Sequence, residues 1–149
     1  MVLPIKKGEN NMKKFTKTMA VALVAVLALA ALVACAPASD PDKAVAALKK
    51  HEYTAAKDSV LIPGALKLVG VKDIEVVVTG SKTVKNDDGS KVESVTIVYF
   101  ASSAAAKDAW SKVEEYAKKD NKDNSSDWTV KQSGAMIYWG TSAAIKAAA

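Results

Sequence analysis

Arginine is absent from this 149-residue chain, whose 21 basic residues are all lysines. Arginine supplies the bidentate contacts with which proteins recognise guanine edges and phosphate groups. The positive charge is also unevenly placed, because five lysines but only one acid, Glu9, precede the apolar run that begins at Met19. From Cys35 onward, 16 lysines stand against 15 acidic residues. The sequence therefore predicts no nucleic-acid partner, and the net charge of +5 mainly describes the N-terminal segment.

Cysteine and histidine occur once each, as Cys35 and His51. One cysteine excludes a disulfide within the chain, and the two residues together are too few for a typical zinc site. Catalysis by histidine needs an oriented partner and a nucleophile, whereas His51 lies at a predicted helix end, where a cation suits the dipole. We therefore predict that the protein is not an enzyme and has no catalytic residues, no metal and no cofactor.

One polar segment, Asn86-Asp87-Asp88-Gly89, invites comparison with a calcium-binding loop. If Gly89 takes the sixth position of such a loop, Val84 and Val95 occupy the first and twelfth positions, where carboxylates belong. Asparagine, aspartate and glycine are also typical of tight turns that need no metal. The sequence favours a hairpin turn.

The chain from Met12 has the parts of a secretory signal peptide. Basic residues come first, and residues 19–34 are 16 consecutive alanines, valines, leucines and one methionine. This run is shorter than the roughly 20 residues that a membrane-spanning helix needs. A basic start, a short apolar middle and small residues at the end indicate an export signal that is removed.

The signal ends in Leu32-Val33-Ala34-Cys35, which resembles the lipobox of bacterial lipoproteins. In that class, diacylglycerol is attached to the cysteine thiol and a dedicated peptidase cleaves before the cysteine. The resemblance implies that Cys35 is the lipid-attachment site and that Leu32, Val33 and Ala34 are recognised by the peptidase. Two acyl chains, such as palmitate, hold a protein stably on a membrane, whereas one does so only marginally. The alternatives are an ordinary signal peptide cleaved elsewhere and an uncleaved anchor helix.

These features predict four segments: a leader outside the native protein (1–11), a lipoprotein signal peptide (12–34), a lipidated tether (35–41) and a single α+β domain (42–149). Met12-Lys13-Lys14 is the more typical start of an export signal, which is why the first eleven residues are set apart. The membrane is then the expected partner through the lipid on Cys35. The location is the cell membrane or the outer membrane, facing away from the cytoplasm.

Helical and strand patterns alternate along the domain. Strands are expected at 74–79, 92–100, 128–132 and 135–139, in two hairpins around the loop 85–90 and around Ser133-Gly134. Apolar residues spaced by three and four predict a helix over 103–119, capped by Ser102 or Ser103. Shorter helices should follow Asp40 and Thr141 as caps. Residues 51–72 predict only a strand at 53–57, a break at Ile62-Pro63-Gly64 and a helical turn near 65–69.

The expected fold class is α+β: an antiparallel sheet of four or five strands with helices packed on one face. The predicted core consists of Ile74, Val76, Val78, Val95, Ile97, Trp110, Val113, Val130, Ile137 and Trp139. Strand alternation assigns five other side chains to the opposite face: Val77, Val98, Phe100, Met136 and Tyr138. This second face is either covered by further helices or is a binding or dimer surface.

Residues 95–110, and the Gly140-Thr141 pair between the last strand and helix, make the domain similar to small lipoproteins of bacterial envelopes, a resemblance that implies no activity. The favoured hypothesis is a non-enzymatic module that binds a protein or envelope component through the five residues of the second face. A small-ligand carrier with a pocket near Trp110 and Trp128 is the alternative, and a structural spacer is a third possibility. The oligomeric state is left open.

Overall fold

A computed structural model describes residues 36–121 and 126–149 of the chain. The chain divides into two units, residues 1–34 and residues 35–149. The predicted leader and signal peptide lie outside the described residues, so the following description concerns the second unit.

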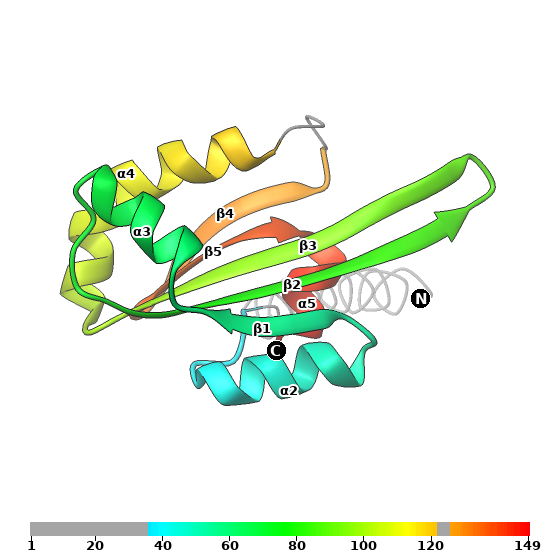
Figure 1. Ribbon diagram of the computed structural model, residues 1–149, viewed down its shortest axis with the longest axis horizontal. Coiled ribbons are helices and arrows are strands. Elements are labelled where there is room, and N and C mark those ends of the chain that lie inside the picture. The colour runs from blue at the N-terminus through cyan, green and yellow to red at the C-terminus, as the bar shows by residue number, and fades with distance from the viewer. Residues whose placement is uncertain (1–35, 122–125) are drawn as a thin grey trace, which may run out of the picture. The chain divides into compact units, whose positions relative to one another are not determined.

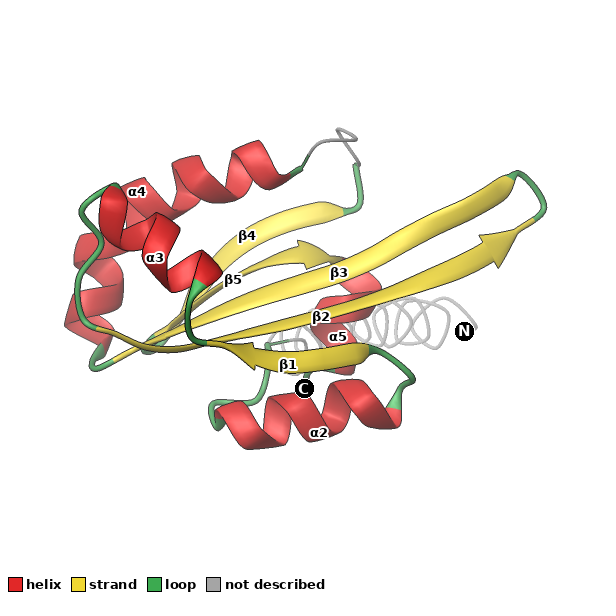
Figure 2. Ribbon diagram, in the orientation of Figure 1, coloured by secondary structure: helices red, strands yellow, loops and turns green. Residues whose placement is uncertain are grey.

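The second unit is an α+β domain built on one antiparallel sheet with the strand order β1-β2-β3-β5-β4 (Figures 1 and 2). The elements in chain order are α2 (Pro41–Lys50), β1 (Thr54–Asp58), α3 (Leu61–Leu68), β2 (Ile74–Asn86), β3 (Gly89–Phe100), α4 (Ser103–Asp120), β4 (Trp128–Ser133), β5 (Met136–Thr141) and α5 (Ser142–Ala147). The predicted fold class and the predicted antiparallel sheet are confirmed.

Helices cover both faces of the sheet. Leu48 of α2 and Ile145 of α5 are buried in one apolar cluster with Val78 and Ile97. Leu66 of α3 and Val113 of α4 are buried in a second cluster, on the other side of the same strands. The sequence predicted helices on one face and offered two alternatives for the second face: cover by further helices, or a binding or dimer surface. The structure shows that helices cover the second face too, and the predicted core residues are divided between the two clusters.

Helix α3 lies within residues 51–72, for which the sequence predicted little regular structure. The predicted break at Ile62-Pro63-Gly64 is wrong, because these residues belong to the helix. Pro63 lies in the first turn, where a helix requires no hydrogen bond from the backbone nitrogen. The Asp58 carboxylate accepts hydrogen bonds from the backbone N–H groups of Val60, Leu61 and Ile62 at 2.9–3.0 Å. Burial opposes ionisation of Asp58, but these donors outweigh it and lower the pKa of its carboxyl group. Asp58 thus holds the start of α3.

The hairpin of β2 and β3 is longer than predicted. The strands pair as far as Asn86 and Gly89, which leaves only Asp87 and Asp88 between them, and Gly89 has a φ of +129°. Neighbouring strands end earlier, because β1 pairs with β2 only up to Ser81 and β5 pairs with β3 only from Val95. The outer part of the hairpin therefore projects beyond the sheet as a two-stranded arm (Figure 1).

Two of the three predicted helix caps are confirmed. The Asp40 carboxylate accepts from the N–H of Asp42 at 2.8 Å, and the Ser102 hydroxyl accepts from Ala105 N–H at 3.1 Å. Thr141 precedes α5 but makes no capping bond with its side chain. Its hydroxyl oxygen instead accepts from Ser94 N–H at 3.2 Å. The Thr141 side chain therefore bonds to β3 and does not cap α5.

Candidate functional site

The five residues predicted to form a partner-binding face are buried and do not share a face. Val77, Val98 and Phe100 belong to the cluster under α3 and α4, whereas Met136 and Tyr138 belong to the cluster under α2 and α5. The prediction of one exposed surface is therefore wrong. Its cause is the register of β3 and β5, in which Val98 lies opposite Ile137 and not opposite Met136 or Tyr138. The predicted alternation of side chains within each strand is confirmed, but the predicted offset between β3 and β5 is wrong.

The predicted lipid-attachment residue, Cys35, and the peptidase-recognition residues Leu32, Val33 and Ala34 lie outside the described residues. Within residues 36–121 and 126–149, no helix is both long enough and apolar enough to cross a membrane. The residues that directly follow Cys35 are described, and they define the first candidate site.

The tether is packed into the domain from its first described residue. Ala38 donates its N–H to the Ala148 carbonyl at 2.9 Å, and the Tyr99 hydroxyl donates to the Ala38 carbonyl at 2.7 Å. Ala36 and Ala38 pack against the cluster under α2 and α5, and Pro37 between them is buried. Sequence reasoning missed this docking, because small residues with a proline are also typical of a linker. The signal that was available is that 36–38 contain no polar side chain.

Tyr99 is a stable donor in this arrangement. Burial, and then the negative charge of Asp40, raise the pKa of the Tyr99 hydroxyl. The hydroxyl therefore keeps its proton across the physiological pH range and continues to donate to Ala38. The contact that holds the tether is thus insensitive to pH in that range.

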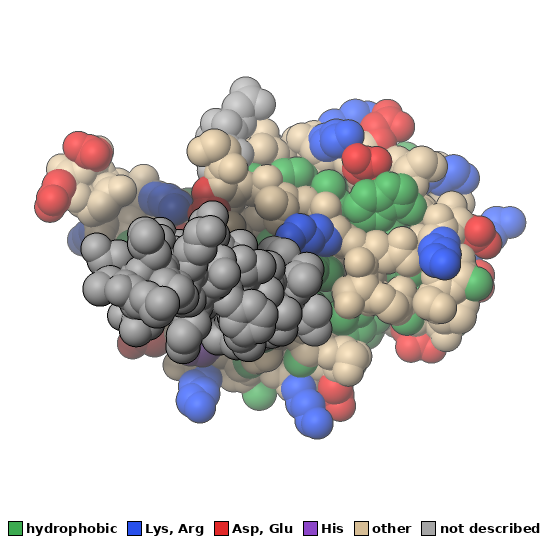
Figure 3. Space-filling view, turned by 180° about the vertical axis from the view of Figure 1, so that it is seen from behind, with side chains coloured by type: hydrophobic (Ala, Val, Ile, Leu, Met, Phe, Trp, Pro, Cys, Tyr) green, Lys and Arg blue, Asp and Glu red, His purple; other side chains and the backbone are tan. Residues whose placement is uncertain are grey.

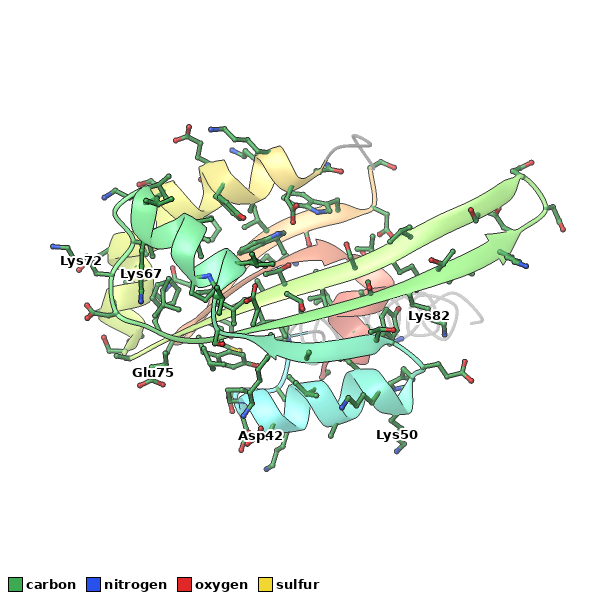
Figure 4. The ribbon with its side chains drawn as sticks, viewed as in Figure 1. Asp42, Lys50, Lys67, Lys72, Glu75 and Lys82 are labelled. Atoms are coloured by element: carbon green, nitrogen blue, oxygen red, sulfur yellow. The ribbon has the colours of Figure 1, made fainter. Side chains whose placement is uncertain are left out.

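A second candidate site is a cleft of about 330 Å³ at the other end of α2. It is lined by His51, Tyr53, Lys82, Ala143, Lys146 and Ala147. Figure 4 labels Lys82, which lies on the α2 side at the base of the projecting arm. Three basic side chains around one cleft favour an anionic ligand, although the charge of Lys82 is shared with the exposed Glu52 at 3.6 Å.

Hydrogen bonds and an aromatic contact fix the wall of this cleft. Lys82 Nζ donates to the His51 carbonyl at 3.1 Å and lies 5.5 Å from the centre of the Tyr53 ring. The Tyr53 hydroxyl donates to the Glu93 carboxylate at 2.5 Å. Burial, that hydrogen bond and the charge of Glu93 all raise the pKa of Tyr53. Tyr53 is therefore a neutral donor already engaged with Glu93, which leaves Lys82, Lys146 and His51 as the groups that face a ligand.

Another hollow, of about 250 Å³, lies between the α3–β2 loop and α4. It includes Asp73, Asp108 and Lys112, and Lys112 Nζ donates to the Gly70 carbonyl at 3.2 Å. Neither hollow is lined by Trp110 or Trp128, which the sequence placed beside a ligand pocket; both indoles pack against the cluster under α3 and α4.

The described residues contain no group of three or more histidine, cysteine, aspartate or glutamate side chains that could hold a metal ion. On the described surface visible in Figure 3, lysines and acidic side chains are interspersed, and they do not form one large patch of either sign.

Comparison with known proteins finds no matching family model, no matching curated protein and no matching solved structure.

Proposed function

We propose that this protein is an extracytoplasmic lipoprotein, anchored by diacylglycerol on Cys35, whose domain is a non-enzymatic binding module at the bacterial envelope. The observation that carries the proposal is the sequence Leu32-Val33-Ala34-Cys35 at the end of a basic and apolar export signal. This pattern puts the cleavage site between Ala34 and Cys35, directly before Ala36, which packs against the domain. The described residues of the tether and of both apolar clusters all follow that cleavage site in the sequence.

The docked tether gives this proposal a geometric consequence. The acylated cysteine would be followed directly by Ala36, which packs against the domain. A stalk of flexible residues would let a domain sample a wide volume, whereas this arrangement holds the domain within a residue or two of the lipid. The protein would therefore meet its partner close to the bilayer surface.

Labelled palmitate and mass spectrometry test the proposal directly. Cells that produce the chain are grown with labelled palmitate, and the purified protein is digested and its N-terminal peptide weighed. We expect the label to be incorporated and the first peptide to begin at Cys35 with a diacylglycerol mass added. An unlabelled protein, or an N-terminus at any residue other than Cys35, would contradict the proposal.

The cleft beside His51 supports a second candidate, binding of a small anion, in place of the pocket that the sequence located near the indoles. We expect inorganic phosphate to shift the NMR signals of His51 and Lys146 with a Kd on the order of millimolar, because exposed charges interact weakly in water. Lys146→Ala should weaken this binding by about threefold. Lys131→Ala, which changes an exposed lysine of β4 outside the cleft, should leave it unchanged. Equal weakening by both variants would show that phosphate responds only to overall charge.

A further inference from the structure

Helix α3 is apolar on two sides, and only one of them faces the domain. Pro63 and Leu66 are buried against the sheet and α4, with Ile62 partly buried beside them. On the outer side the chain exposes four large aliphatic residues: Val60 (71%), Leu61 (79%), Leu68 (89%) and Val69 (50%). Leu61, Ala65 and Leu68 are spaced by four and three, so they form one stripe along the helix. A polar face would be expected if this surface served only to contact water.

In the sequence, the residue types of the exposed positions are symmetric about the middle of α3. The sequence from 60 to 69 reads Val-Leu-Ile-Pro-Gly-Ala-Leu-Lys-Leu-Val, so that Val60 mirrors Val69 and Leu61 mirrors Leu68. The centre of this pattern lies between Gly64 and Ala65, the two smallest side chains of the helix. A Cβ added at Gly64 would meet no atom within 4 Å, so the centre of the stripe is open on its outer side.

We propose that the stripe of Leu61, Ala65 and Leu68, with the exposed Val60 and Val69 at its two ends, is a self-association surface, on which α3 of a second copy of this chain docks antiparallel. A two-fold interface uses the same patch on both partners, and the mirror pattern makes this patch complementary to itself. Antiparallel pairing puts Leu61 of one copy beside Leu68 of the other. Glycine and alanine at the centre let the two helices approach closely, since small residues reduce the distance between helix axes.

The size of the stripe predicts a reversible dimer. Its aliphatic side chains expose on the order of 400–500 Å² per copy, so that a pair would bury about 800–1,000 Å², just below the usual range for stable complexes. The tether packs against the opposite cluster, under α2 and α5, and so leaves this surface uncovered. The inference does not depend on acylation of Cys35.

Cysteine cross-linking of the full chain tests the surface. Under mild oxidation, we expect Ala65→Cys to form a covalent dimer, because the two-fold axis brings residue 65 of both copies together. The matched control is Ala46→Cys on the exposed side of α2, and the unmodified chain reports any background from Cys35. Dimer yield from Ala65→Cys no higher than from Ala46→Cys overturns the proposal. If the protein carries no acyl lipid but still cross-links at residue 65, the proposed lipid anchor is contradicted and the proposed self-association surface is supported.

Two further experiments test the direction of docking and the role of the stripe. Leu61→Cys and Leu68→Cys, produced together with different tags, should form mixed dimers in preference to dimers of either alone, whereas preferential self-linking would overturn the antiparallel arrangement. Adding Leu68→Asp to Ala65→Cys should lower dimer yield at least about tenfold, as expected when a charge replaces a large apolar contact of the interface. Leu68→Ser is the milder substitute if the aspartate variant unfolds. Unchanged yield in a variant that retains its thermal unfolding transition overturns the role of the stripe.

Discussion

Cys35→Ser is expected to abolish acylation and to leave the chain at precursor size, with residues 1–34 still attached. A serine hydroxyl is a far weaker nucleophile than a cysteine thiolate, so diacylglycerol is not transferred to it. The apolar run that remains has 16 residues, fewer than the roughly 20 that span a bilayer. We therefore expect alkaline washing of membranes to release the variant more than about ten times as readily as the parent, which two acyl chains retain. Immunoblots of washed membranes and supernatants measure this ratio.

The matched control for that experiment is Ser39→Ala, in the same segment and exposed. It should be processed, labelled and retained like the parent. If Cys35→Ser were also cleaved and retained like the parent, the lipid anchor would have to be abandoned, whatever the fold of the domain.

Gly140→Ala is expected to cost about 3–5 kcal/mol of unfolding free energy, the range of the most damaging single substitutions. Gly140 has a φ of +146°, a conformation that other residues adopt only with strain. A Cβ at this position would also lie 2.0 Å from the Ser94 carbonyl oxygen and 2.8 Å from Val95 Cα. The backbone cannot retreat easily, because Gly140 is paired with Val95 between β3 and β5 in the middle of the sheet. Urea unfolding followed by tryptophan fluorescence measures the loss.

Gly134→Ala separates the effect of space from that of backbone conformation. Gly134 also has a positive φ, +57°, but an added Cβ there would meet no atom within 4 Å. This variant should lose only about 1 kcal/mol, the usual cost of a left-handed conformation for a residue with a Cβ. Similar losses in the two variants would mean that the strands β3 and β5 can separate to accept the methyl group.

The projecting arm, and the predicted break at Pro63 that proved wrong, show where the pattern of neighbouring residues does not predict the secondary structure. The polar residues 85–90 favour a loop by composition, yet all but Asp87 and Asp88 belong to strands, because each strand of a hairpin supplies the other's hydrogen bonds. Pro63 and Gly64 disfavour a helix by propensity, yet α3 forms because Asp58 caps its start and Leu66 is buried beneath it. In both places, contacts with other parts of the chain outweigh the preference of the residues themselves.

The tether illustrates the same limit at the candidate site. The lipobox-like end, the short apolar run and the basic start predict an export signal from the sequence alone, because enzymes of the export system read such signals as linear patterns. The docking of Ala38 on Tyr99 and Ala148 joins residues 61 and 110 positions apart. No pattern in residues 36–41 alone distinguishes such docking from a free linker.

The sequence by itself determined the near-neutral charge of the domain. It also predicted the caps at Asp40 and Ser102 and the amphipathic helix α4, because each of these depends on residues near one another in the chain. Only the tertiary structure decided which side chains share a face. Successive residues of a strand point to opposite sides, so an offset of one residue between β3 and β5 exchanges the two faces, and such an offset is set by packing across the whole sheet. The same packing buried the predicted partner face and left the outer side of α3 exposed.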